Sequence, residues 1–406
     1  MNKHPLTKIK IFDLLKKISI TNLESEKIEL SIAEGRILST DIFSAINLPP
    51  FNNSAVDGYA VHNDNLNSPK RLKCIQRVAA GDQSEILLKV DEVARIFTGA
   101  RMPQNSNTVV MQENVVISND YVVMSKIPKQ GENCRLAGED IAKTDKILQS
   151  GDKINSSNLN LIAAIGKKNV EVKKKLKIGY FTSGNELREP SEILKGAEIN
   201  NSNRYSLHSL LKNNYIDSCY LGILKDSKKN IIESLIKNAN DYDILITTGG
   251  ASVGEEDHLV HVVDENGKIF FWKTAIKPGR PLAIGQINKT IIICLPGNPV
   301  SVHLLYGLII KPFLAFLCGS KMNKPRSFKA IVNFSMKKKT KRLEWIRVTL
   351  DPNNLETIYV NKYQKQGSGM ISSIAFSDGI VEIPESISKI NKGDKFDFYL
   401  FDQLFN

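Results

Sequence analysis

The stretch Asp243-Ile244-Leu245-Ile246-Thr247-Thr248-Gly249-Gly250-Ala251-Ser252-Val253-Gly254-Glu255-Glu256-Asp257-His258 predicts a buried strand, a glycine turn and the start of a helix. Its apolar run at 244–246 is bounded by turn residues, which favours a strand covered on both faces of a parallel sheet. An apolar helical pattern begins at the acids near the end of the stretch. The chain around it should therefore form a parallel sheet with helices.

The turn in this stretch predicts a site for an anion and a metal ion. Gly249 and Gly250 let bare backbone approach a ligand closely. Ser252 and Gly254 would add hydroxyl and amide groups at a helix N-terminus. Carboxylates such as Asp257 repel phosphate unless a divalent cation lies between them, and Mg²⁺ is usually held by carboxylates and substrate phosphates. The alternative is that the acids only occupy the first helical turn, where the helix dipole favours them.

Residues 176–319 alternate regularly between strand and helix patterns. This order predicts βαβ crossovers, and so an α/β fold with a doubly wound parallel-sheet central domain. In such sheets ligands bind at the carboxyl ends of the strands. The predicted strands are 177–181, 215–223, 243–248, 282–284 and 290–295, and the predicted helices are 206–212, 227–240, 257–263 and 299–317.

The flanking segments predict three further domains. Short β patterns follow Pro49 and Pro50, at 72–79, 93–97, 108–111, 115–117 and 121–124, and strict alternation returns at 328–334 and 343–350. Near the N-terminus we expect a helix within 5–20, a strand at 28–30, a helical turn at 33–38 and a helix at 157–165. The expected domains are a mixed N-terminal domain (1–45 plus 138–174), an inserted β domain (46–137), the α/β domain (175–322) and a C-terminal β-barrel-like domain (326–406).

Composition and charge are typical of a soluble globular protein, with 42% hydrophobic and 24% charged residues. No run approaches the roughly 20 apolar residues of a membrane-spanning helix, and the N-terminus lacks a secretory signal, so we expect a cytoplasmic protein without a membrane partner. The lysines behind the net charge of +12 are scattered, which favours a solvated surface over nucleic-acid binding. The five cysteines form no Cys-x-x-Cys pair, which argues for reduced thiols and against a zinc site.

Two acids follow predicted strands. Glu186 lies in Thr-Ser-Gly-Asn-Glu-Leu at 182–187 and could ligate a metal ion, although a plain polar turn would read the same way. Asp226 follows the strand predicted at 215–223, but it also precedes Ser227 and could cap the next helix. Both acids are candidates for the same edge of the sheet.

A basic loop at 273–281 predicts contacts with an anion. It carries Lys273, Lys277 and Arg280, and two prolines around a glycine stiffen it. Side chains held in place lose less entropy when they bind an anion. The alternative is an ordinary basic loop, but loops as rigid as this one usually hold binding or catalytic side chains in position.

The loop at 295–301 ends a predicted buried strand and begins a long helix. Asn298 is placed as its N-cap and Pro299 at its first helical position, so free N–H groups would form a second anion site. Helix initiation alone explains Asn298 and Pro299 equally well, but it does not explain why Pro296 and Gly297 precede them.

Taken together, these loops resemble molybdopterin molybdenumtransferase, the family that includes the C-terminal part of gephyrin. The motifs are Thr-Thr-Gly-Gly-Ala-Ser-Val-Gly-Glu-Glu-Asp (247–257), Ile-Lys-Pro-Gly-Arg-Pro (276–281) and Leu-Pro-Gly-Asn-Pro-Val-Ser (295–301). Ser-Ala-Val-Asp-Gly-Tyr-Ala (54–60), Ile-Phe-Thr-Gly-Ala (96–100) and Gly-Glu-Asp-Ile (138–141) extend the likeness to nearly the whole chain. The resemblance implies four domains and an elongated homodimer in which the β domain reaches the partner's active site.

The resemblance also implies an activity: insertion of molybdate into the dithiolene of adenylylated molybdopterin, with Mg²⁺-dependent release of AMP. We expect Mg²⁺ on Asp257 and Glu186, and molybdate beside Lys273, Lys277 and Arg280. By motif, Glu186, Asp226 and Asp257 match acidic active-site positions of the family, and Lys273 and Lys277 match basic ones. Asp57, Thr98 and Asp140 match positions outside the sheet domain. Pro296 and Pro299 match the family's proline loop.

Four positions depart from the family pattern. Val56 replaces a usual methionine, Ala137 a frequent arginine, and Asn185 a usual aspartate. Asn185 removes a charge next to Glu186, so the set of acids that holds the metal stays open. Arg280 replaces a common lysine, which keeps the charge and adds a fork that suits oxyanions.

Two other functions compete with this one. The adenylyltransferase that makes the substrate shares the Gly-Gly loop, but the three additional domains argue against it. A scaffold without catalysis is conceivable because gephyrin also clusters receptors, but the acids and cations at the strand ends argue against it. That adenylyltransferase and molybdoenzyme chaperones are the partner proteins we expect.

Overall fold

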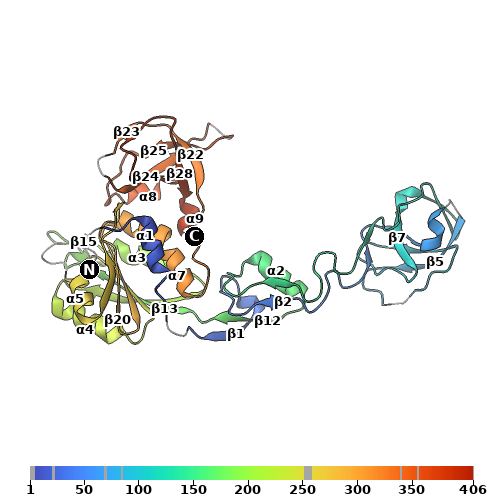
Figure 1. Cartoon of the computed structure of the whole chain (residues 1–406), viewed down its shortest axis with the longest axis horizontal. Helices are drawn as coiled ribbons and strands as arrows, with labels where there is room; N and C mark the ends of the chain where they lie inside the picture. Colours follow the sequence, from blue (N-terminus) through green and yellow to red (C-terminus); the bar gives the residue numbers. More distant parts are fainter. Residues whose placement is uncertain are drawn as a thin grey trace. The chain divides into compact units, whose positions relative to one another are not determined.

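The computed structural model describes residues 5–20, 23–67, 71–83, 86–250, 258–338, 341–353 and 356–405. The chain forms two compact units, and each is described by itself (Figure 1). The first unit contains Met1–Ser39, Ser150–Ile154 and Glu171–Asn406, and the second contains Thr40–Gln149 and Asn155–Val170.

A six-stranded mixed sheet forms the centre of the first unit. Four of its strands are parallel, as the regular alternation predicts, but at one edge β20 is antiparallel to β21, and β18 is antiparallel to β20. Strand β18 was not predicted, because its short apolar run stands directly before the basic loop. In spatial order the strands are β16 (Ile216–Leu224), β13 (Leu176–Ser183), β17 (Ile244–Thr248), β21 (Thr290–Leu295), β20 (Ala283–Ile287) and β18 (Lys268–Trp272).

Helices cover both faces of this sheet, which confirms the doubly wound α/β expectation. Alternate residues of β17 show why: Ile244 and Ile246 belong to one apolar core, and Leu245 belongs to the other. The first core also contains residues of α3 (Ser202–Leu210), α6 (Pro299–Leu305) and α7 (Lys311–Leu317), and the second contains residues of α4 (Lys228–Asn238) and α5 (Leu259–Asn266).

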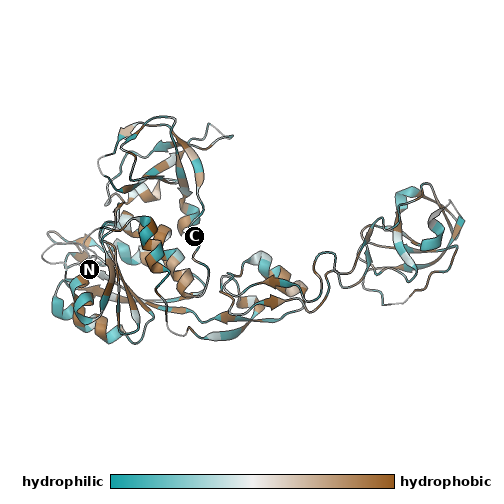
Figure 2. Ribbon diagram, in the orientation of Figure 1, coloured by the Kyte–Doolittle hydropathy of each residue, from teal (hydrophilic) through white to brown (hydrophobic). Residues whose placement is uncertain are grey.

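Helices α6 and α7 are joined by the π-helical turn η4 (Tyr306–Ile310) into one apolar helix. Figure 2 shows it as predominantly hydrophobic. Within the described residues, 299–317 is the one helix long and apolar enough to cross a membrane, so the expectation that no run approaches that length is wrong. Of its most apolar 18-residue window, 72% is buried inside the protein, which accounts for the composition of this helix without a membrane.

A closed barrel follows in the same unit, as strict alternation at 328–334 and 343–350 predicts. Its strands are β24 (Leu343–Leu350), β25 (Tyr359–Lys362), β22 (Phe328–Val332), β28 (Lys395–Leu400) and β26 (Gly379–Ile383), and β26 pairs with β24 to close the ring. The short strand β19 (Ile276–Lys277), from the basic loop, joins the edge of β24. The barrel therefore shares a ladder with the loop that we expected to bind an anion. Around it lie β23 (Met336–Lys337), β27 (Lys389–Ile390), α8 (Ser372–Ala375) and α9 (Phe401–Phe405).

The N-terminal segment of the first unit begins with α1 (Lys8–Leu15), which buries Ile11, Phe12 and Leu15 in the core, as predicted. The helical turn predicted at 33–38 is wrong: Ile37 and Leu38 are buried in extended bridges to Lys153 and Val172, and this tertiary pairing overrides the local pattern. The remaining elements are β1 (Ser25–Glu29), which pairs with β12 (Asn169–Lys173), η1 (Leu30–Ile32), and the pair β14 (Leu187–Arg188) and β15 (Ile199–Asn200).

The second unit is built around a six-stranded sheet, and the β patterns predicted between 72 and 124 all form strands of it. In spatial order these are β7 (Ser106–Met111), β4 (Gly58–His62), β6 (Glu92–Ile96), β5 (Arg71–Val78), β9 (Tyr121–Met124) and β8 (Val115–Ser118). The other elements are β2 (Ile42–Phe43), β3 (Asn53–Ser54), β10 (Cys134–Arg135), β11 (Lys146–Leu148), η2 (Asn63–Asn67), η3 (Gln112–Asn114) and the predicted helix α2 (Ser156–Ala164).

Candidate active site

The loops after four parallel strands meet at the carboxyl edge of the sheet in the first unit. Gly249, after β17, donates its backbone N–H to Leu295 O at 3.1 Å, at the end of β21. The Ser183 hydroxyl, at the end of β13, donates to Asp226 Oδ1 at 3.1 Å, after β16. Loops that are far apart in the sequence therefore form one continuous rim.

Gly249 is needed for this close approach. Its φ is +93°, and a Cβ there would lie 2.3 Å from Ser183 O. Any other residue would combine a left-handed backbone with a clash against a backbone oxygen. Gly250, with φ +64°, continues the turn. The other residues predicted in this turn, Ser252, Gly254 and Asp257, lie outside the described residues.

Asp226 is tied to the loop after β13 rather than to the helix that follows it. Its carboxylate accepts hydrogen bonds from the Ser183 hydroxyl and from Asn185 N, each at 3.1 Å. In return, Asp226 N donates to Asn185 Oδ1 at 3.3 Å. The described contacts of Asp226 therefore do not support the alternative interpretation, in which it caps the next helix. Asn185, in place of the family's aspartate, supplies an acceptor to Asp226 without adding a second charge beside it.

Glu186 lies in a cavity of about 520 Å³, here called the amide cavity. Its side chain is exposed there and has no hydrogen-bond or ion-pair partner in the part of the chain that the structure describes. Sequence reasoning missed the asparagine-rich segment after β15 that forms one wall. The amide cavity is lined by Ser183, Glu186, Leu187, Ile199, Asn200, Asn201, Ser202, Asn203, Thr248, Gly297, Asn298, Pro299, Gly369 and Ile371.

Asn203 connects that wall to the proline loop. Its Nδ2 donates to Gly297 O at 2.7 Å, while its Oδ1 is buried and has no hydrogen-bond partner within the described ranges. The Thr248 hydroxyl is also buried, and no described residue forms a hydrogen bond with it. Unpaired buried polar atoms are unusual in folded proteins and often mark functional sites. The amide cavity thus combines a free carboxylate with polar groups whose hydrogen-bonding capacity is unused.

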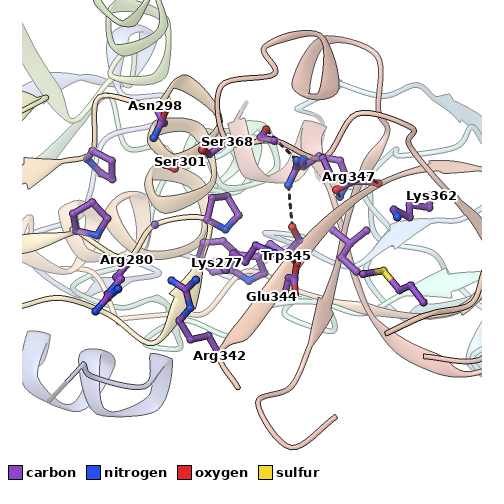
Figure 3. A pocket seen from close by; sticks show the side chains of 18 of the residues that line it. Lys277, Arg280, Asn298, Ser301, Arg342, Glu344, Trp345, Arg347, Lys362 and Ser368 are labelled. Atoms are coloured by element: carbon purple, nitrogen blue, oxygen red, sulfur yellow. Dashed lines mark hydrogen bonds and ion pairs between the residues drawn. The ribbon is translucent and has the colours of Figure 1, made fainter. Parts of the chain in front are cut away.

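A second cavity of about 570 Å³, here called the basic cavity, lies between the basic loop and the barrel (Figure 3). Six cationic side chains line it, and Glu344 is the one acid among its described lining residues. Such an excess of positive charge favours an anionic ligand. The cations are Lys277, Arg280, Lys337, Arg342, Arg347 and Lys362, and the other residues labelled in Figure 3 are Asn298, Ser301, Trp345 and Ser368.

Arg347 is the most deeply placed of these cations, at 1% exposure. Its guanidinium donates to Ser373 Oγ, Trp345 O and Gly367 O at 3.1 to 3.3 Å. These acceptors are neutral, so they orient the guanidinium without cancelling its charge. Burial lowers the pKa of Arg347 to about 10, and the charge of Glu344 opposes this shift. The sequence pattern placed Arg347 on a strand but did not indicate its role in the site. The signal that could have indicated this role is a basic residue within a run of buried apolar residues.

Asn298 lines both cavities, so the acidic and the cationic loops converge on the proline loop. Pro296 lines the basic cavity and Pro299 the amide cavity. The barrel also contacts this loop, because Val300 N donates to Ser368 O at 3.2 Å. Lys273, by contrast, lines neither cavity. Its ammonium lies 4.3 Å from the centre of the Trp272 ring.

In the second unit, Asp57 and Thr98 form a pair. Both the backbone N–H and the hydroxyl of Thr98 donate to Asp57 Oδ1 at 2.8 Å. These hydrogen bonds lower the pKa of Asp57, so its carboxylate stays ionised. Asp140 is exposed, and its backbone N–H donates to Leu48 O at 3.0 Å.

Carboxylate oxygens of Glu186 and Asp226 fit a hard cation such as Mg²⁺. A carboxylate offers about four acceptor sites, and Asp226 uses only two in its described hydrogen bonds. Asn185 joins the two acids, because it precedes Glu186 and bonds to Asp226. In the described ranges no cluster of three or more His, Cys, Asp or Glu side chains that could hold a metal is found.

Three family models together cover most of the chain. Residues 8–166 match the MoeA N-terminal region (domain I and II), residues 179–315 a probable molybdopterin binding domain, and residues 329–401 the MoeA C-terminal region (domain IV). These are the segments that contain the second unit's sheet, the rim and the barrel.

Relatives match over nearly their full length. A molybdopterin molybdenumtransferase of Haemophilus influenzae is 33% identical over 383 residues, which is 94% of this chain and 95% of that protein. A putative molybdopterin biosynthesis protein of Methanocaldococcus jannaschii is 33% identical over 399 residues, or 96% of each chain. The crystal structure of the molybdopterin biosynthesis MoeA protein of Pyrococcus horikoshii superposes with a TM-score of 0.83 at 29% identity, covering 98% of this chain and 100% of that one. The chain therefore belongs to the molybdopterin molybdenumtransferase (MoeA) family, the transferases of molybdenum cofactor biosynthesis.

Proposed function

We propose that this chain inserts molybdate into the dithiolene of adenylylated molybdopterin and releases AMP in a Mg²⁺-dependent step, giving molybdenum cofactor. The observation that carries the proposal is that Asn298 lines both the basic cavity and the amide cavity. An oxyanion and a phosphorylated pterin could therefore be held side by side, which is the proximity that a transfer between them needs.

The basic cavity supports molybdate binding. Molybdate is a dianion, and Lys277, Arg280 and Arg347 offer cationic donors from two sides of the cavity. Arg347 is already oriented by neutral acceptors, so its side chain loses little conformational entropy when an anion binds. In this proposal Lys273, which the family resemblance also assigns to the site, acts from its place beside Trp272 at the other end of the basic loop.

The amide cavity supports binding of the adenylylated substrate. Asn200, Asn203 and Thr248 supply polar atoms that suit the edge of a pterin or the oxygens of a pyrophosphate. Glu186 and Asp226 would hold Mg²⁺, together with Asp257 from the loop after β17. When bound, the metal would stabilise negative charge on the leaving AMP. The chain's own part is to hold these carboxylates in position, which Ser183 and Asn185 do for Asp226 through their hydrogen bonds.

We also propose that the protein is a homodimer, with Asp57 and Thr98 of one chain completing the site of the other. The hydrogen bonds that Thr98 donates to Asp57 fix a negative charge beside the start of β4 and the end of β6. Expected protein partners are the molybdopterin adenylyltransferase and chaperones that pass the cofactor to molybdoenzymes.

Incubation of the purified chain with adenylylated molybdopterin, molybdate and Mg²⁺ tests the proposal, with AMP as the readout. AMP should appear only when both molybdate and Mg²⁺ are present. Substitution of sulfate for molybdate is the control for a general anion effect. AMP release that does not depend on molybdate, or consumption of ATP with molybdopterin, would contradict the proposal and favour the adenylyltransferase alternative.

A further inference from the structure

Glu344 has an unusual place in the basic cavity. It is 7% exposed, and its Oε1 accepts an ion-pair hydrogen bond from Lys277 Nζ at 2.7 Å. The other carboxylate oxygen, Oε2, is buried and has no hydrogen-bond partner among the residues that the structure describes. The basic cavity, which suits anionic ligands, therefore already contains one carboxylate, and only one of the two oxygens of this carboxylate is hydrogen-bonded to a described residue.

The two partners of this ion pair differ in access to solvent. The Lys277 side chain is 38% exposed, whereas the Glu344 side chain is 9% exposed. Lys277 and Glu344 are also paired across β19 and β24, so their backbones are fixed side by side. A long, exposed lysine can turn toward a ligand, but a short, buried carboxylate cannot follow it. When the ion pair breaks, we therefore expect the Lys277 side chain to move and the Glu344 side chain to stay in place.

The charge of Glu344 acts on other cations of the barrel as well. Burial lowers the pKa of Arg342, with a further lowering by Arg280, and Glu344 opposes both effects. Burial also lowers the pKa of Arg347, and Glu344 again opposes it. Glu344 thus supplies part of the negative charge that these cations need while no ligand is bound.

We propose that Glu344 is an exchangeable internal anion: it holds Lys277 in the basic cavity, yields this lysine to an incoming oxyanion, and so weakens oxyanion binding and speeds release. This rests on the proposed function, because it takes the basic cavity to be the molybdate site. Glu344 is a positioning residue, since it acts through Lys277 and repels the ligand. A cavity with six cations and no acid would bind a dianion more tightly and release it more slowly.

Glu344→Gln tests this inference, because glutamine keeps the size and one acceptor for Lys277 but removes the charge. Molybdate binding is measured by titration calorimetry on the full chain at constant ionic strength, and its dissociation by stopped flow. We expect the Kd for molybdate to fall about tenfold, with a slower dissociation rate, as removal of one nearby like charge predicts. Glu344→Asp, which keeps the charge, should retain a Kd close to that of the parent protein.

Glu382→Gln is the matched control. Glu382 is a carboxylate of the same barrel, paired with Lys8 at 2.5 Å, and it does not line the basic cavity. Glutamine can still accept the hydrogen bond that Trp345 Nε1 donates to Glu382. This variant should change thermal stability without changing the Kd for molybdate.

An unchanged or higher Kd in Glu344→Gln would overturn the inference, provided that Arg347→Lys weakens molybdate binding in the same assay. A purely structural role for Glu344 predicts that result, since loosening the barrel can only loosen the site. If neither Arg347→Lys nor Lys277→Ala affected molybdate binding, the basic cavity would not be the molybdate site, and the proposed function would fail together with this inference.

Discussion

The amide cavity and the basic cavity share Asn298, but they are built in opposite ways. The amide cavity is formed mostly by loops at the carboxyl ends of strands in one sheet, and its free charge is the negative one of Glu186. The basic cavity is formed by two domains, and its cations come from segments as far apart as Lys277 and Lys362. The comparison teaches that the sheet organises the acidic half of the site, while docking of the barrel creates the cationic half.

The largest effect should come from Gly249→Ala, which acts on the sheet side of this comparison. The new Cβ would lie 2.3 Å from Ser183 O at a φ of +93°. Backbone strain alone costs about 1–3 kcal/mol, and the clash adds to it. We expect AMP release to be lost and the melting temperature to fall. Gly222→Ala is the control, because Gly222 has φ +105° but no atom of a described residue lies within 4 Å of an added Cβ. Equal effects in both variants would show that the contact with Ser183 does not matter.

Arg347→Lys should damage only the cationic half. Lysine keeps the charge but loses the fork that bonds Ser373 Oγ and Gly367 O. Losing a well-oriented charged contact is equivalent to about 1.5–3 kcal/mol, so the Kd for molybdate should rise about 10- to 100-fold, as measured by calorimetry. Binding of AMP should not change. Arg36→Lys, at a buried arginine paired with Glu26 outside both cavities, is the control. A matching loss of AMP binding in Arg347→Lys would mean that the two halves are not separate.

Glu186→Gln should damage only the acidic half. Loss of the free carboxylate should raise the Mg²⁺ concentration needed for half-maximal AMP release about tenfold or more, a change typical of altered metal surroundings. The Kd for molybdate in the absence of Mg²⁺ should stay the same. A Mg²⁺ titration of AMP release measures the first quantity and calorimetry the second. An unaltered Mg²⁺ requirement would remove Glu186 from the metal site.

The smallest effect is expected for Asn185→Asp, which restores the residue usual in the family. Aspartate can still accept the N–H of Asp226, so the loop geometry should persist. The added charge beside Glu186 and Asp226 should tighten Mg²⁺ binding by a few-fold and lower stability slightly when Mg²⁺ is absent. Melting curves with and without Mg²⁺ check both effects. A variant that is more stable without Mg²⁺ would contradict this account.

The sheet and its loops could be predicted from the sequence because their signals are local. The run 244–246, the glycines after it and the Asn298-Pro299 helix start each carry their own pattern, and the structure brings Gly249, Asp226, Glu186 and Asn298 to one rim. The barrel was predicted from alternation for the same reason.

The basic cavity could not be predicted from the sequence in this way. Lys277 and Glu344 are 67 positions apart, and only the docking of β19 on β24 brings them together. The antiparallel strand β18 and the bridges of Ile37 and Leu38 were missed for the same physical reason. Their conformation is decided by partners far along the chain, which local propensity does not encode.

Crystals soaked in tungstate, an oxyanion of the same shape and charge as molybdate, give the most direct test of the convergence of acids and cations at Asn298. Anomalous scattering from tungsten locates the ion independently of the protein phases. The account predicts a peak in the basic cavity, within contact of Lys277 and Arg347 and next to Asn298. A peak found only beside Lys273 and Trp272, or anywhere away from the proline loop, would contradict it.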